Sequence, residues 1–367
     1  MRNSNHTTLA AVLIVLALFA NYSIYSKIIT DKLPKAEYTE PQNTELTAAQ
    51  KAELEKKQRE EDILNNYTNL TATENDTKCG ELILVNKQHL FDFDARATLF
   101  ETELPESIYQ KKTDNYYVKN VNISLNQSAI EALNKLLDDF AAATGHKDII
   151  IVDAFRSYET QQIVLDAKIA QYGEEQGRLI ATEPGASEHH SGYAIDLSLY
   201  INSQQLDYDG TGDYEWITQN CAKYGFVIRY PEGKTNITEI DYEPWHLRYV
   251  GIPHAKYMTE NNLCLEEYIE KLALYPIDSE RLKISDYDGN NYEVYSFSVP
   301  SDGSEIKVPK NKPYTLSGDN AGHIIVTVSE NAQPVQDNTQ AVQNSETPSQ
   351  SEDNAQSSDN TENVTAG

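Results

Sequence analysis

The chain has 367 residues and a formal net charge of −27, from 57 acidic and 30 basic side chains. This charge argues against nucleic acid or an anionic membrane surface as a partner. Hydrophobic residues make up 39% of the chain. Because long polar stretches lie near both ends, about 200 to 250 residues remain for compact structure, which suits one main domain and a small satellite.

A membrane anchor is predicted within residues 1–30. Residues 9–20 form an unbroken apolar run that continues with light interruption to Tyr25. About 17 such residues can just span a bilayer, whereas about 12 suit the core of a signal peptide. No A-x-A cleavage site follows, which favours an uncleaved anchor over a cleaved signal. The basic flanks leave the orientation open.

Residues 31–78 are predicted to form a polar stalk. Within them, 48–65 (AQKAELEKKQREEDILNN) is dense in Glu, Lys and Gln and has little apolar stripe. This composition is typical of a solvated helical spacer. A disordered stalk would equally hold a folded domain away from the membrane.

The folded part is predicted to open with a strand at 81–86, where the sequence is ELILVN. Apolar side chains at helical spacing then predict a helix over 126–144. Ser124 or Asn126 would cap its start, and Gly145 would end it.

Four further elements follow in chain order: a buried strand at 148–153, helices at 159–172 and 213–224, and a strand at 226–229. Helices and strands mix without a regular βαβ repeat. Residues 79–275 are therefore predicted to form an α+β domain with a small antiparallel sheet and flanking helices.

The texture changes after this domain. Residues 276–330 contain short alternating runs separated by Asp-Gly and Ser-Gly turns, which predicts a small all-β appendage. Residues 331–367 are polar, acidic and free of Lys and Arg, so they bury too little apolar area to offset the entropy of ordering and are predicted to be disordered.

Three cysteines, Cys79, Cys221 and Cys264, are widely separated and have no CxxC spacing. Buried or free thiols are the favoured interpretation, and one disulfide stays open as an alternative outside the cell.

Two short segments carry the chemistry: SEHHSGYAID at 187–196 and EPWH at 243–246. A catalytic zinc takes three N or O ligands from the protein and keeps an open fourth position for water. His189, Asp196 and His246 supply such a set. A turn at Gly192 can return Asp196, on an emerging strand, to the side of His189.

The doublet His189-His190 requires a choice, because adjacent residues on a strand point to opposite faces. One of the two is a neighbour of the site and no ligand. Glu243 lies three residues before His246, where its carboxylate can stand beside a metal-held water without binding the metal, the position of a general base.

These segments resemble the SxHxxGxAxD and EPWH signatures of the D-alanyl-D-alanine carboxypeptidase family of the vancomycin-resistance type. That family consists of zinc peptidases and also includes D,D-dipeptidases and L,D-carboxypeptidases. The resemblance covers about residues 82–272. It includes AFRSYETQ at 154–161, EPGAS at 183–187, GFVIRYP at 225–231 and RYVG at 248–251.

The resemblance implies that His189, Asp196 and His246 bind Zn²⁺, that Glu243 is the catalytic base, and that His190 is no ligand.

For the substrate, the resemblance implies that Arg156 contacts the reacting end and that Ser187 lines the same pocket. A guanidinium suits a terminal carboxylate or an oxyanion through charge-assisted hydrogen bonds. Tyr158 and Gln161, three residues apart at a helix start, can both face the cleft, although such residues often only cap a helix. Trp245 is expected to form a wall of the substrate site.

Hydrolysis of the terminal D-alanine from peptidoglycan stem peptides is the leading functional hypothesis. An L,D-carboxypeptidase that cuts tetrapeptide stems uses the same motifs and stays open as an alternative. A hypothesis of a different class is a non-catalytic wall-binding scaffold, against which the intact Glu243 argues. No obligate protein partner is inferred, and the catalytic domain is expected outside the cytoplasm, held at the cell membrane by a single pass or secreted if the N-terminal segment is cleaved.

Overall fold

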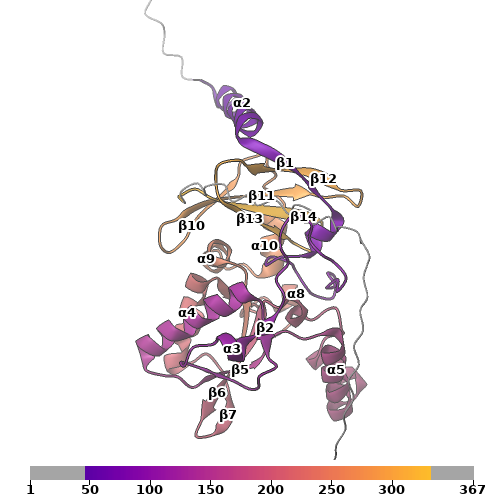
Figure 1. Ribbon diagram of the computed structural model, residues 1–367, viewed down its shortest axis with the longest axis vertical. Helices are drawn as coiled ribbons and strands as arrows, with labels where there is room; N and C mark the ends of the chain where they lie inside the picture. The colour runs from indigo at the N-terminus through magenta and orange to yellow at the C-terminus, as the bar shows by residue number, and fades with distance from the viewer. Residues whose placement is uncertain (1–45, 332–367) are drawn as a thin grey trace, which may run out of the picture. The chain divides into compact units, whose positions relative to one another are not determined.

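The computed structural model describes residues 46–331. The chain divides into two units between Glu55 and Lys56, and the fold described below is that of the second unit. Helix α2 (Ala48–Asn66) opens the described chain (Figure 1), in agreement with the helix predicted for 48–65. Across residues 46–331, helices are too short or too polar to span a membrane. The predicted anchor at 1–30 and the predicted tail beyond Asn331 lie outside the described residues.

The main domain is built on a six-stranded sheet, of which β5, β6 and β7 are labelled in Figure 1. Its strands run in the order β3-β5-β6-β9-β8, and β7 pairs with β6. All pairs are antiparallel except β3–β5, which is parallel, so the sheet is mixed where an antiparallel one was predicted. The strands are β3 (Tyr117–Val118), β5 (Ile149–Asp153), β6 (Ala194–Ile201), β7 (Gln204–Asp207), β8 (Phe226–Ile228) and β9 (His246–Tyr249).

Helix α4 (Gln127–Thr144) covers this sheet with its apolar face, as its periodicity predicts. Asn126 precedes it, and Gly145 ends it in a left-handed conformation with φ 81°. Leu133, Leu137 and Phe140 are fully buried with the strands in one core, and each such side chain contributes about 1.5–3 kcal/mol by leaving water.

Helix α5 (Tyr158–Tyr172) is the second long helix of the main domain. The other helices are short: α3 (Ile108–Lys111), α6 (Glu174–Ile180), α7 (Glu215–Asn220), α8 (Thr235–Thr238), α9 (Ile252–Glu260) and α10 (Leu265–Leu272). The helix predicted over 213–224 is instead α7 flanked by 3-10 turns η3 (Gly212–Tyr214) and η4 (Cys221–Tyr224). A third 3-10 turn, η2 (Glu188–Ser191), precedes β6, and η1 (Glu74–Lys78) precedes the main domain. Gly225 ends η4 with φ 86° and leaves no room for a side chain beside the Tyr249 ring.

The prediction of a strand at 81–86 is wrong. These residues are buried but irregular, because side chains and loop groups satisfy their backbone in place of a neighbouring strand. Arg248 donates to the carbonyl oxygens of Glu81 and Ile83, while the N–H of Leu82 donates to Ser317 Oγ. The apolar composition was correctly assigned to the core, but the hydrogen-bond partners depend on residues far away in the chain.

The predicted all-β appendage is present. Strands β10 (Leu282–Ser285), β11 (Asn291–Ser298), β14 (His323–Ser329) and β13 (Tyr314–Gly318) form an antiparallel sheet in that order. Strand β12 (Ser304–Pro309) pairs with β1 (Tyr67–Ala72), from Tyr67 opposite Pro309 to Ala72 opposite Ser304. A short pair, β2 (Glu106–Ser107) with β4 (Ser124–Leu125), completes the strands.

Strand β1 lies inside the segment predicted as stalk. Its side chains Tyr67 and Ala72 belong to the apolar cluster of the appendage. The predicted division at residue 78 therefore separates two strands that pair with each other.

A buried histidine joins the appendage to the main domain. His254 on α9 lies 2.7 Å from the Tyr268 hydroxyl on α10 and 3.0 Å from Thr327 Oγ1 on β14. Both ring nitrogens are thus occupied, and burial lowers the pKa of His254 to about 3. Cys79, Cys221 and Cys264 are buried free thiols.

Candidate active site

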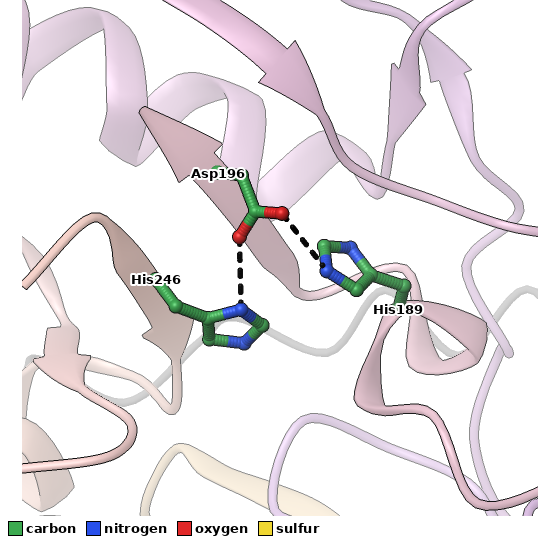
Figure 2. A group of neighbouring side chains, drawn as sticks. All are labelled: His189, Asp196 and His246. Carbon is green, nitrogen blue, oxygen red and sulfur yellow. Dashed lines mark hydrogen bonds and ion pairs between the residues drawn. The ribbon is translucent and has the colours of Figure 1, made fainter. Parts of the chain in front are cut away.

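Three side chains lie in one row across the central sheet. Asp196 on β6 is the register partner of His246 on β9 and of Asp153 on β5. Residues directly opposite on antiparallel neighbours present their side chains on the same face. Asp196 Oδ1 accordingly lies 2.9 Å from His246 Nδ1 (Figure 2).

His189 reaches this row from turn η2, which comes just before β6 in the chain. Gly192 reverses the chain with φ 72°, and a Cβ on it would lie 2.6 Å from Asn126 Oδ1. The turn brings His189 Nε2 to 3.4 Å from Asp196 Oδ2. His189, Asp196 and His246 each offer a ligand atom, and these atoms lie within 4.8 Å of one another (Figure 2).

The outer nitrogens of the two histidines set their tautomers. His189 Nδ1 lies 2.6 Å from the Ala154 carbonyl oxygen, and His246 Nε2 lies 3.1 Å from Glu188 Oε2. Both oxygens can only accept, so both outer nitrogens carry the proton. The inner nitrogens, His189 Nε2 and His246 Nδ1, face the Asp196 carboxylate and are the atoms with which the two rings would bind a metal.

Two imidazole nitrogens that face one carboxylate are stabilised by a positive charge between them, which either a proton or a metal ion can supply. Burial opposes an imidazolium at His246, yet the Asp196 and Glu188 carboxylates outweigh it and raise the pKa of His246 to about 9. Two imidazole nitrogens and one carboxylate oxygen are also donors that suit a divalent transition metal. The residues therefore fit a metal centre.

His190 has no part in this group. Its Nδ1 donates to the Arg156 carbonyl oxygen at 2.7 Å, and its Nε2 accepts from the Gly185 N–H at 3.0 Å. Burial lowers the pKa of His190 to about 4. Its role is to join the chain after β5 to the loop that precedes η2.

Arg156 stands at the edge of the metal-binding group, with Nη2 3.7 Å from Asp196 Oδ2. Its Nε and Nη2 contact Asp153 Oδ2 at 2.9 and 2.8 Å, and its Nη1 donates to Gln161 Oε1 at 2.9 Å. Gln161 is 1% exposed, and its Nε2 donates to the Thr182 carbonyl oxygen. The structure therefore makes Gln161 a support for Arg156, where the sequence indicated a contact with substrate.

Glu243 lies close to the metal-binding group but outside it. Its Oε2 is 3.9 Å from His246 Nδ1, the nitrogen that faces Asp196. The side chain is 28% exposed, and burial raises its pKa.

The remaining predicted residues lie in different surroundings. Trp245 and Tyr158 are exposed by 36% and 50%, and the Tyr158 ring packs edge-on against Phe93. Ser187 is buried directly before η2. Trp245 and Tyr158 thus offer free surface, whereas Ser187 does not.

Glu188 and the two arginines that hold it, Arg229 and Arg248, were not predicted from the sequence as part of the site. All three are buried. One signal was present: Arg248 is two residues after His246, and residues two apart on a strand share a face. An arginine at 248 that points to the same face of the sheet as the metal ligand His246 would be buried, and a buried guanidinium needs a carboxylate partner.

The α+β fold and a site of two histidines, a carboxylate, a neighbouring glutamate and an arginine define the chain as a peptidase. The chain belongs to the VanY family of D-alanyl-D-alanine carboxypeptidases, whose model matches residues 122–252. This confirms the resemblance drawn from the motifs and, with it, a carboxypeptidase acting on D-Ala-D-Ala.

A D-alanyl-D-alanine carboxypeptidase of Enterococcus faecium is 31% identical over 259 residues, which is 70% of this chain and 78% of that protein. The putative carboxypeptidase YodJ of Bacillus subtilis (strain 168) is 36% identical over 193 residues, which is 52% of this chain and 67% of that protein. Among solved structures, the vancomycin resistance D,D-dipeptidase VanXYg in complex with a D-Ala-D-Ala phosphinate analog superposes with a TM-score of 0.62. It is 28% identical, and the match covers 72% of this chain and 99% of that one.

Proposed function

We propose that this protein is a zinc-dependent carboxypeptidase that releases the terminal D-alanine from peptidoglycan stem peptides, with Glu243 as the general base. One observation carries the proposal: His189, Asp196 and His246 bring one possible ligand atom each to within 4.8 Å of one another, while Glu243 Oε2 stands 3.9 Å from His246 Nδ1 without joining them.

His189, Asp196 and His246 would hold the zinc. When bound, zinc lowers the pKa of a coordinated water toward about 7 and polarises the scissile carbonyl. A zinc with three protein ligands would keep a fourth position for water and substrate.

Glu243 moves the proton. Its Oε2 accepts a proton from the attacking water as the oxygen bonds to the carbonyl carbon, and then gives it to the nitrogen of the departing D-alanine as the C–N bond breaks. Partial burial raises the pKa of Glu243, which makes the protonated form easier to reach and suits a group that first accepts and then donates.

Arg156 would bind the negatively charged group of the substrate or of the transition state. Asp153 and Gln161 occupy three of its N–H groups, so the guanidinium is oriented before substrate arrives. The second proton on each Nη nitrogen remains for a terminal carboxylate or a developing oxyanion. Trp245 and Tyr158 would add exposed aromatic surface for the stem peptide.

We also propose that the enzyme acts outside the cytoplasm, tethered to the cell membrane by the apolar segment within residues 1–30. Peptidoglycan, its proposed substrate, lies on that side of the membrane, and the charge-rich helix α2 would serve as a spacer.

The test is a product assay by mass spectrometry on defined pentapeptide and tetrapeptide stems, with wild type, Glu243→Gln and the exposed control Glu239→Gln. Wild type with zinc should release one D-alanine from the pentapeptide and lose activity with a chelator. Glu243→Gln should be slower by about 10² to 10⁴, with Glu239→Gln near wild type. No D-alanine release by wild type would sink the proposal, and cleavage of the tetrapeptide alone would replace it with L,D-specificity.

A further inference from the structure

We propose that Glu188 is a positioning residue for the metal centre: it fixes the tautomer and orientation of His246, and two buried arginines hold it in place for that purpose. This inference rests on the proposed zinc-dependent function. Glu188 is separate from the three ligands and from the base, and it lies directly before His189 in turn η2.

The two oxygens of Glu188 have separate partners. Oε1 accepts from Arg229 Nε at 2.6 Å and from Arg248 Nη1 at 2.7 Å. Oε2 faces His246 Nε2 at 3.1 Å. Since both guanidinium groups bind one oxygen, the other is free to accept the imidazole proton.

Each arginine is in turn fixed from its far side. Arg229 donates to both oxygens of Glu266 on α10, at 2.9 and 2.7 Å. Arg248 donates to the carbonyl oxygens of Glu81 and Ile83, at 2.8 and 2.9 Å. The Glu188 side chain is fully buried, and rotation would leave the N–H groups of Arg229 Nε and Arg248 Nη1 without their acceptor, which is costly in a buried site. Its Oε2 therefore has one direction, toward His246.

The consequence falls on the inner nitrogen of His246. With the proton held on Nε2 by a carboxylate, Nδ1 keeps its lone pair for the metal. Turn η2 thus controls both histidine ligands, because it carries His189 itself and reaches His246 through the Glu188 side chain. Partners of this kind typically change metal affinity by about 10 to 100-fold when they are replaced.

The same cluster supplies a matched control. Glu266 is a second buried carboxylate on Arg229, but its hydrogen bonds go to Arg229 and Asn86, with none to His246. A purely structural cluster would respond alike to the loss of either charge. A positioning role separates the two.

The experiment measures the zinc dissociation constant by chelator competition, the melting temperature and D-alanine release for wild type, Glu188→Gln and Glu266→Gln. A glutamine has one acceptor oxygen, which cannot serve two guanidinium groups and an imidazole together. Glu188→Gln should weaken zinc binding by about 10 to 100-fold, and Glu266→Gln by less than about threefold at a comparable loss of melting temperature. Equal zinc affinity in wild type and Glu188→Gln, or equal weakening in both variants, would overturn the inference.

A second measurement uses the wild-type protein and does not depend on how well the variants fold. Nitrogen-15 NMR of the histidine rings should show His246 protonated at Nε2 with zinc bound at Nδ1. A proton on Nδ1 would refute the role of Glu188 even if the enzyme is active. Failure of wild type to bind zinc would instead refute the proposed function, and this inference with it.

Discussion

The buried histidine between the main domain and the appendage predicts a specific loss of stability in mild acid. His254 is 1% exposed, and burial lowers its pKa from the ordinary 6.5 to about 3. The unfolded chain therefore binds a proton at His254 between these two values and the folded chain does not. The resulting stability is fully present above pH 6.5 and decreases as the pH falls toward 3.

The magnitude between pH 7 and pH 5 depends on the unfolded chain alone, because the folded histidine stays neutral throughout that range. At pH 5 the unfolded imidazole is almost fully protonated, and each pH unit below its ordinary pKa is worth about 1.4 kcal/mol. His254 should therefore reduce the free energy of unfolding by about 2 kcal/mol between pH 7 and pH 5.

Urea unfolding of wild type and His254→Gln at both pH values measures this contribution. The glutamine can hydrogen-bond to Tyr268 and Thr327 but does not titrate, so its stability should decrease with pH by about 2 kcal/mol less than that of wild type. Other histidines titrate in both proteins and cancel in the difference. Parallel pH dependences would refute the assignment of a neutral, buried His254.

Three further predictions concern the site and the domain boundary. Gly192→Ala should cost more stability than Gly233→Ala in paired thermal melts. Both positions need a positive φ, which costs about 1–3 kcal/mol for alanine, but only a Cβ at 192 meets Asn126. Equal losses in the two variants would contradict this. Gln161→Ala should lower kcat/KM by about 10-fold through a displaced Arg156, while its neighbour variant Gln162→Ala stays near wild type; unchanged kinetics in both would argue against the support role. A chain that begins at residue 79 lacks β1 and should melt earlier than one that begins at residue 56, and identical melting would show that the β1–β12 pair adds nothing.

The sequence by itself determined those helices and strands that depend only on neighbouring residues. The apolar spacing of 126–144 and the flanking Asn126 and Gly145 define helix α4, because helical periodicity and caps are short-range properties. The alternating runs with tight turns likewise predicted the strands of the appendage. The spacing of His189 and Asp196 around Gly192 pointed to a metal site for the same reason, since a single turn joins the two residues.

Long-range pairing decided the rest. Residues 81–86 have strand composition, but their backbone partners are Arg248 and Ser317, and β1 pairs with a strand that lies more than half the chain away. Composition cannot identify such partners. A hydrogen bond forms wherever the fold brings a donor and an acceptor together, and the local sequence around either group does not reveal the other.

The same reason separates what was evident about the site from what was not. The residue types and spacing around His189 and His246 determined which side chains are chemically suited to hold a metal. Only the tertiary structure showed that Gln161 turns inward to hold Arg156, and that Glu188 shares two buried arginines and faces His246. Buried charges are stable only with partners, and the fold alone decides which partners come within reach.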